Sequence, residues 1–422
     1  MRVAFISPSG FGNLGDAAIQ DTFIEGVRER LGQVDIVGIT QNPPDTEERH
    51  HVRAVPMDVL AFALHPDRAP TDKGLVSRLH DGAAPSTATG VVHGLKLAVK
   101  EVLHWGIAFR EMRRADVLAV SGGGQLDEHW GGPWRVPYSL WKWSLVARLL
   151  RTDVVVLSVG AGTTDSRLTR FFLRSTLRRA RYASFRDERT AARVRSLGVS
   201  SPRVVPDLAF GHEGRRRAPV GAQGRRPRVA ISPIAFLDPV AWPAKDVDAY
   251  RGNLRRTAEL VGLLLDRGYD VVLCTSDTPD VKSARELLEE VGAQADDRPD
   301  RSEGEGTLTH EDTTTPAELL EAFAAADVAV ASRLHGLILA NLAGLPTVAL
   351  SYDWKVDEHM RTIGLERYTF PIDTFAAAEV ARAVDEMVSE REALATAVAE
   401  RCELLAGAVG KQFDEVFPAP AP

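Results

Sequence analysis

The stretch DVAVASRLHGLILANLAGLPTVALSY (residues 327–352) contains one complete strand–helix–strand unit. Its first apolar run, 327–332, has the length of a buried strand, the alanine- and leucine-rich segment 336–344 predicts a helix, and 346–352 is a second apolar run. Two strands joined by a crossover helix pair in parallel. The stretch therefore predicts an α/β fold with a parallel sheet.

The same alternation of strands and helices runs through most of the chain. The predicted strands before the Gly-, Arg- and Pro-rich segment 213–228 are 2–7, 34–40, 116–122, 153–160 and 182–187, and those after it are 229–236, 269–276, 327–332 and 346–352. A strand-first series that restarts after a linker predicts two Rossmann-like lobes with mainly parallel sheets. The predicted boundaries are an N-terminal domain at 1–212, a linker at 213–228, a C-terminal domain at 229–408 and a flexible tail at 409–422. Residues 61–95 show no convincing period and predict an insertion.

Composition narrows the class of protein. The chain has 422 residues, of which 44% are hydrophobic and 26% are charged, as in ordinary globular proteins. The net charge of −7 argues against nucleic-acid binding, which usually needs a basic surface. Cys274 and Cys402 are too few for a disulfide framework, and no segment has the apolar length of a signal-peptide core or a bilayer span. We therefore expect a cytoplasmic protein with no nucleic-acid partner.

A glycine-rich turn, SGFGNLGD (9–16), joins the first predicted strand to the first helix. Its G-x-G-x-x-G spacing matches the dinucleotide-binding pattern. Two features oppose that interpretation. The second strand ends at Thr40 with no acid for the ribose hydroxyls, and Asp16 would place a negative charge where a pyrophosphate has to lie. Asp16 either caps the helix or acts on an acceptor hydroxyl, and the glycines admit a ligand close to the backbone.

Two further motifs at strand ends each allow two interpretations. The triple glycine at 122–124 is either a tight turn or a set of exposed N–H groups beside a ligand. In SFRDERTA (184–191), Arg186 either lies in a cleft beside a carboxylate or belongs to a charge cluster at a helix start. Four of the seven tryptophans fall within 130–143, where core packing, sugar stacking and membrane contact remain open.

Metal binding has weak support in the sequence. Asp246 and Asp248 have the spacing of a metal-binding pair, but such matches are common by chance. No His or Cys cluster has the spacing of a zinc site.

The segment 331–355 carries the most informative side chains. Arg333 and His335 follow one predicted strand, and Lys355 follows the next. In open α/β sheets, ligands bind outside the carboxyl ends of the strands, and a helix that starts at Gly336 offers free N–H groups to an anion. Arg binds a carboxylate or phosphate through two bonds, Lys adds a point charge, and His donates a proton. The pattern predicts a site for a small ligand with several negative charges, with separate surface cations as the alternative.

Taken together, the motifs resemble those of the polysaccharide pyruvyl transferase family. The resemblance rests on GNLGDAAI (12–19), SGGGQL (121–126), FRDERTA (185–191), PDLAF (206–210), SRLHGLILANLAGLP (332–346) and YDWK (352–355), which occur in the family's order. It implies two Rossmann-like lobes in a glycosyltransferase-B-like arrangement. It also implies an enzyme that transfers pyruvate from phosphoenolpyruvate to two hydroxyls of a sugar, forming a cyclic ketal and releasing phosphate.

The resemblance associates His335 and Lys355 with donor binding and catalysis, and Arg333 lies in the same motif. We expect His335 to protonate the methylene carbon of phosphoenolpyruvate and Asp16 to act as the acceptor-side base. The other expected site residues are Ser332 and Gly336 for the donor, and Gly12, Asn13, Gly15, Gly122, Gly123, Gly124 and Arg186 on the acceptor side or in the cleft. The scheme needs no metal and no cofactor. The expected partners are phosphoenolpyruvate and a saccharide of the cell envelope, while lipid linkage and peripheral contact with the inner membrane face stay open.

Two rival functions remain. A nucleotide-sugar glycosyltransferase also uses His-Gly before a helix, but such enzymes often carry a glutamate in that helix to hold the ribose, and residues 336–346 contain no acid. A two-lobed anion-binding protein without catalysis would need no proton donor beside the anion. Phosphate release from phosphoenolpyruvate separates both rivals from pyruvyl transfer.

Overall fold

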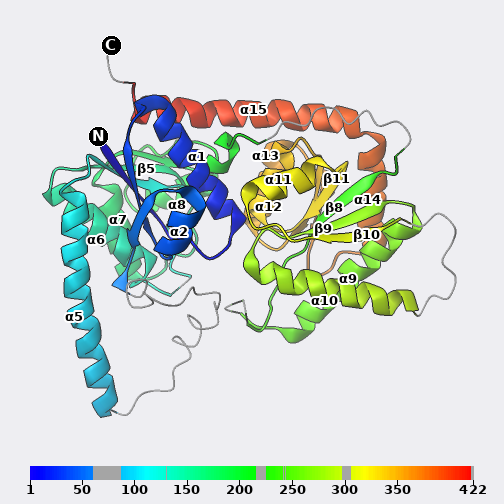
Figure 1. Cartoon of the computed structure of the whole chain (residues 1–422), viewed down its shortest axis with the longest axis horizontal. Coiled ribbons are helices and arrows are strands. Elements are labelled where there is room, and N and C mark those ends of the chain that lie inside the picture. Colours follow the sequence, from blue (N-terminus) through cyan, green and yellow to red (C-terminus); the bar gives the residue numbers. More distant parts are fainter. Residues whose placement is uncertain are drawn as a thin grey trace. The chain divides into compact units, whose positions relative to one another are not determined.

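The computed structural model describes residues 1–59, 87–129, 131–214, 225–240, 242, 244–296 and 306–419 (Figure 1). Contacts divide the chain into two compact units. The first unit comprises Met1–Phe11, Asp16–His212 and Leu405–Pro422, and the second comprises Gly12–Gly15 and Glu213–Leu404. Each unit is built around its own parallel sheet.

The sheet of the first unit has seven strands in the order β3-β2-β1-β4-β5-β6-β7, and every pair is parallel. The strands are β1 (Arg2–Ser7), β2 (Asp35–Thr40), β3 (Arg53–Pro56), β4 (Val117–Ser121), β5 (Asp153–Val159), β6 (Ala180–Phe185) and β7 (Arg203–Val204). The helices are α1 (Leu14–Leu31), α2 (Pro43–His50), α5 (Thr87–Met112), α6 (Val136–Leu149), α7 (Arg167–Leu177) and α8 (Glu188–Ser196), followed by the 3₁₀ turn η1 (Leu208–Gly211).

The sheet of the second unit has six parallel strands in the order β10-β9-β8-β11-β12-β13. The strands are β8 (Arg228–Ser232), β9 (Asp270–Cys274), β10 (Leu308–Glu311), β11 (Val328–Ala331), β12 (Thr347–Ser351) and β13 (Thr369–Pro371). The helices are α9 (Val247–Asp266), α10 (Thr278–Asp296), α11 (Pro316–Ala324), α12 (Leu334–Leu342), α13 (Trp354–Ile363), α14 (Ala377–Ser389) and the long α15 (Arg391–Val416), and η2 (Glu366–Tyr368) is a 3₁₀ turn.

Both sheets have buried central strands, because helices cover a parallel sheet on its two faces. In β1, residues 3–7 are buried, and all four residues of β11 are buried. The strand order reverses once in each sheet, between β1 and β4 in the first unit and between β8 and β11 in the second. In doubly wound sheets, ligands bind at the carboxyl ends of the strands that flank this reversal.

The predicted fold class is confirmed, and several boundaries differ. Sequence periodicity missed β3, β10 and β13, which have only three or four residues and lie at the sheet edges. Of the predicted insertion at 61–95, residues 61–86 lie outside the described residues, and residues 87–95 belong to α5. Of the predicted linker, residues 215–224 lie outside the described residues.

The predicted tail at 409–422 is wrong for its first half. Residues 409–416 are the end of α15, and they pack against the first unit. Phe413 is buried with its ring 6.3 Å from that of Phe23, and Arg30 Nε donates to Asp414 at 2.9 Å. The Pro- and Ala-rich end suggested disorder, but the apolar positions before it bury their surface against α1.

Among the described residues, no helix has the combination of length and apolarity that a bilayer span requires.

Candidate functional site

The carboxyl edge of the second sheet places Arg333 and His335 at the start of α12. The helix begins at Leu334, two residues earlier than predicted, so His335 lies in its first turn. The first intrahelical bond runs from Leu337 N–H to the Arg333 carbonyl at 3.0 Å. The N–H groups of Leu334, His335 and Gly336 precede that bond and point toward the sheet edge, where they favour an anion.

Arg333 makes bonds that the sequence did not predict. Its guanidinium donates to both oxygens of Asp280, with Nη2 at 2.8 Å from Oδ1, and Nη1 lies 3.2 Å from Asp277 Oδ2. Asp280 is fully buried and also accepts the Ala235 N–H at 3.0 Å. Arg333 therefore holds the loop after β9 against the start of α12, and its removal would leave a buried carboxylate without its counter-ion.

The electrostatics of this pair follow from burial and proximity. Burial acts to lower the pKa of Arg333, but the Asp280 and Asp277 carboxylates outweigh it and raise that pKa above its usual range. Arg333 therefore stays charged. Burial also raises the pKa of Tyr352, which follows β12 directly and begins the YDWK motif, while the Arg333 guanidinium opposes that shift.

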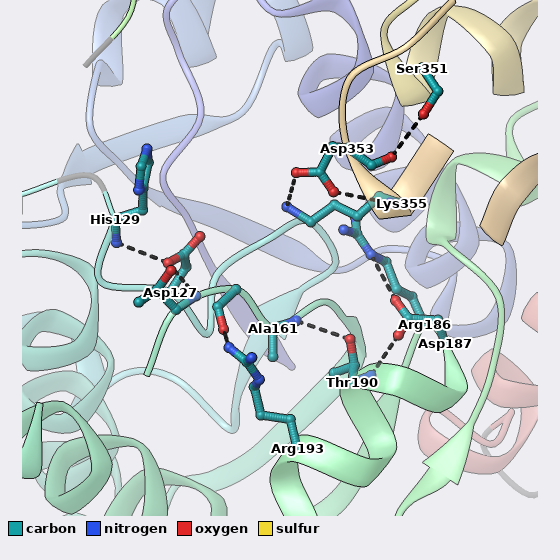
Figure 2. A network of polar contacts seen from close by, with 12 residues as sticks. Asp127, His129, Ala161, Arg186, Asp187, Thr190, Arg193, Ser351, Asp353 and Lys355 are labelled. Carbon is teal, nitrogen blue, oxygen red and sulfur yellow. Dashed lines mark hydrogen bonds and ion pairs between the residues drawn. The ribbon is translucent and has the colours of Figure 1, made fainter. Parts of the chain in front are cut away.

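Lys355 lies in the first turn of α13 rather than in a loop (Figure 2). Asp353 caps this helix by accepting the Lys355 N–H at 3.0 Å, and the Lys355 Nζ lies 3.9 Å from the Asp353 carboxylate. The ammonium also lies 6.0 Å from the centre of the Trp354 ring. Because β12 is the direct neighbour of β11, α13 and α12 start at the same sheet edge.

Residues Gly12–Gly15 group with the second unit. Leu14 N–H donates to the Ser276 carbonyl at 3.0 Å, and Asn13 Nδ2 donates to Asp277 at 3.2 Å. A Cβ on Gly15 would lie 2.1 Å from the His335 ring, so any larger residue there would displace the imidazole. The prediction placed Gly12, Asn13 and Gly15 on the acceptor side or in the cleft, and in the structure their neighbours are the segment from Ser276 to Thr278 and His335.

Sequence reasoning missed the loop TSDTPD (275–280) and the end of β8. The loop supplies Asp277, the first turn of α10 at the end of this stretch supplies Asp280, and Ser232 ends β8. Two acids within six residues of the end of β9 were a usable signal. Their pairing with Arg333 depends on strand order, which the sequence does not state. Ser332 is buried directly before Arg333, as its place at the end of β11 requires.

The carboxyl edge of the first sheet gathers Asp16 and the triple glycine. Gly122 and Gly123 have φ of 56° and 69°, a region that favours glycine. A Cβ on Gly123 would lie 3.9 Å from Asp16 Oδ1, so this carboxylate lies beside the turn. Gln125 Nε2 donates to the carbonyls of Ile6, Ser121 and Gly122, and thereby ties β1 to β4 at the reversal. Gly124 has no atom within 4 Å of a built Cβ among the described residues.

Arg186 lies beside two carboxylates, an arrangement that fits both of its interpretations, and the nearer partner in sequence, Asp187, is drawn in Figure 2. Its Nε is 3.4 Å from Asp187 and its Nη1 is 3.3 Å from Asp207, the acid of the PDLAF motif. Asp187 also caps α8 by accepting the Thr190 N–H at 2.6 Å. A Cβ on Gly160, directly after β5, would lie 2.5 Å from Arg186 Nε, so any larger residue there would displace the guanidinium.

The remaining motifs have structural roles. Asp246 caps α9 by accepting the N–H groups of Asp248 and Ala249 at 3.1 and 3.0 Å, which explains the Asp-x-Asp pattern. In the part of the chain that the structure describes, no group of three His, Cys, Asp or Glu side chains is arranged to hold a metal ion. Both cysteines are free and buried, and burial raises the pKa of Cys402 to about 12.

Comparison with known structures supports the fold. The chain is similar to a UDP-GlcNAc 2-epimerase from Methanocaldococcus jannaschii, with a TM-score of 0.54 and 10% identity over 93% of this chain and 94% of that one. It is also similar to a glycosyltransferase from Rickettsia africae, with a TM-score of 0.55 and 8% identity over 99% of each chain. These neighbours confirm the glycosyltransferase-B-like fold that the motifs implied.

Comparison with sequences defines the family. A search of curated proteins gave no match. The family model described as polysaccharide pyruvyl transferase matches residues 13–353, which include the candidate residues of both sheet edges from Asn13 to Asp353. Lys355 lies just beyond the match. The chain belongs to the polysaccharide pyruvyl transferase family and is an enzyme of this kind.

Proposed function

We propose that the enzyme transfers the pyruvyl group of phosphoenolpyruvate to two hydroxyls of one sugar in a cell-envelope glycan or its precursor. The product is a cyclic ketal, and phosphate is released. The observation that carries this proposal is His335 in the first turn of α12, at the strand reversal of its sheet, in a chain of this family. A group that merely held an anion would not need to exchange a proton, whereas an imidazole does so near neutral pH.

The chemistry needs one proton on the donor and two acceptor hydroxyls. His335 protonates the methylene carbon, which becomes the methyl group and leaves C2 electrophilic. The first sugar hydroxyl forms a bond to C2 and loses its proton. The bond from C2 to the phosphate oxygen then breaks. The second hydroxyl closes the ketal by forming a bond to C2, and its proton returns to the His335 imidazole. The positive charges of Lys355 and Arg333 and the N–H groups of α12 favour the anionic donor.

Asp16 serves the acceptor in this proposal. Its carboxylate lies beside the triple-glycine turn at the reversal of the first sheet, where backbone N–H groups and small residues admit a sugar. As a base it takes the proton of an attacking hydroxyl. No step requires a metal or a cofactor, so we expect turnover to survive treatment with a chelator.

A basic face on the first unit suggests a site of action at the inner membrane surface. Residues 131–152 and 166–186 contain no acid in a chain of net charge −7. The exposed positions of α6, α7 and the residues after them are Arg148, Leu149, Arg151, Arg167, Arg170, Phe171, Arg174 and Arg178, and we name the exposed positions 167–178 on and just after α7 the α7 basic face. Leu149 and Phe171 are 61% and 56% exposed. Arginines around exposed apolar side chains suit an anionic bilayer, and a lipid-linked acceptor would be presented there.

The test is phosphate release from phosphoenolpyruvate with a panel of cell-envelope glycans. We expect release only with an acceptor that carries two neighbouring free hydroxyls, and a product heavier by one ketal-linked pyruvate in mass spectrometry. The His335→Gln variant is the control for contaminating phosphatase. Sugar transfer from a nucleotide sugar, with no phosphate release from phosphoenolpyruvate, would reject the proposal in favour of a glycosyltransferase.

A further inference from the structure

Two buried serine hydroxyls lie at the carboxyl edge of the second sheet. Ser232 is the last residue of β8, and Ser276 follows β9 by two residues. Each serine is only 2% exposed, and neither Oγ has a hydrogen-bond partner among the described residues. Because a buried hydroxyl without a partner costs stability, most such groups in native proteins are paired. Two such hydroxyls in one place indicate that they donate to a bound ligand.

Both hydroxyls converge on the first turn of α12. A Cβ built on Gly336 would lie 3.6 Å from Ser276 Oγ and 3.7 Å from Ser232 Oγ. Gly336 is the third residue of this nine-residue helix, and the helix-capping residue Arg333 makes no side-chain capping bond. The N–H groups of the first turn and the two hydroxyls therefore form one set of donors. They lie where β8 and β11 flank the strand reversal, the usual ligand position in such sheets.

The charges beside this set are arranged so that an anion is tolerated. Asp277 and Asp280, which follow Ser276 in sequence, are both paired with donors of the protein. Asp277 accepts from Arg333 and from Asn13, and Asp280 accepts from Arg333 and the Ala235 N–H. The helix N-terminus supplies partial positive charge to the set of donors.

We propose that Ser232 Oγ, Ser276 Oγ and the first-turn N–H groups of α12 bind the phosphate group of the donor, and then the phosphate that leaves. This inference rests on the proposed function, because it assigns the phosphate end of phosphoenolpyruvate to a particular subsite. A tetrahedral dianion has enough acceptor sites for two hydroxyls and several N–H groups. The hydroxyls stabilise the charge that grows on the phosphate oxygen when its bond to C2 breaks. His335, in the same helical turn, then lies next to the enol carbons.

The experiment measures binding of inorganic phosphate, phosphoenolpyruvate and pyruvate by calorimetry or competition in Ser232→Ala, Ser276→Ala and the double variant. Each lost hydroxyl is expected to weaken phosphate and phosphoenolpyruvate binding about 10- to 100-fold, the usual effect of a bond to a charged group. Pyruvate, which has no phosphate, should bind with unchanged affinity. The melting temperatures should stay equal or rise, because each variant removes a buried hydroxyl that has no partner in the described part of the chain.

The matched control is Ser283→Ala. Ser283 is a buried serine of α10 whose hydroxyl lies 3.1 Å from that of Tyr250, so this variant should lower the melting temperature and leave phosphate binding unchanged. Unchanged phosphate affinity in the double variant would overturn the subsite. If the double variant does not fold, unchanged affinity in both single variants would overturn it. If wild type binds phosphate through these serines but never consumes phosphoenolpyruvate, the subsite stands and the proposed donor fails.

Discussion

The carboxyl edges of the two sheets share a plan and differ in charge. Each edge has a strand reversal and an arginine held by two aspartates, Arg186 in the first unit and Arg333 in the second. The first edge then adds the triple-glycine turn and Asp16, whereas the second adds a helix N-terminus, His335 and two serine hydroxyls that have no hydrogen-bond partner among the residues the structure describes. The shared arginine clusters stabilise loops, so the residues that differ are the better candidates for chemistry.

The largest effects are expected when the two proposed proton-transfer groups, His335 and Asp16, are replaced in turn by neutral side chains. His335→Gln should keep most of the donor affinity, because the amide still donates a hydrogen bond, while turnover falls about 10²- to 10⁴-fold. Asp16→Asn should slow turnover and leave phosphoenolpyruvate binding unchanged. Calorimetry with the donor and phosphate-release rates on the same samples measure both. If donor affinity and turnover fall by the same factor in His335→Gln, His335 is a binding residue only.

The carboxylates of the two arginine clusters differ in burial. Replacing each arginine with alanine should therefore cost different amounts of stability. Arg333→Ala leaves the fully buried Asp280 without its counter-ion, a change that typically costs about 3 to 5 kcal/mol. Arg186→Ala should cost less, because the side chains of Asp187 and Asp207 keep 11% and 5% exposure to water, whereas that of Asp280 has none. Chemical denaturation measures both. In the double variant Arg333→Ala/Asp280→Ala, stability should partly return, and equal losses in the two single-arginine variants would contradict the comparison.

Low pH should lower the stability of the first unit by protonating Asp21. Burial acts to raise its pKa, but hydrogen bonds with His212 and His50 outweigh burial and lower the pKa of Asp21 from 3.8 to about 2. The folded-state pKa lies below the unfolded value, so this group contributes stability above pH 3.8 that is lost as pH falls through 2. The contribution near neutral pH is about 2 kcal/mol. Unfolding free energies between pH 2 and 6 test it, and Asp21→Asn should flatten the profile in that window.

The α7 basic face belongs to the first unit alone, and charge reversal tests whether it contacts membrane. Arg170→Glu/Arg174→Glu should lower partition onto anionic phosphatidylglycerol vesicles about 30-fold or more, at about 1 kcal/mol for each arginine. Arg361→Glu/Arg382→Glu, on exposed positions of α13 and α14, is the matched control in the second unit. Vesicle sedimentation is the measurement. Equal loss in both pairs, or equal binding to neutral phosphatidylcholine vesicles, would show that the face has no special role.

Sequence patterns were enough to predict the alternation of strands and helices, the family, and the placement of Arg333, His335 and Lys355 after strands of one sheet. These features are local, since apolar periodicity and short motifs report on residues that are close along the chain. Which strand ends lie next to one another is visible only in the folded structure. Strand order brings the loop after β9 to Arg333 and brings Ser232 and Ser276 to Gly336, and it carries the end of α15 to the first unit. The free energy that selects these pairings comes from burial summed over a whole unit, so no short stretch of sequence states it.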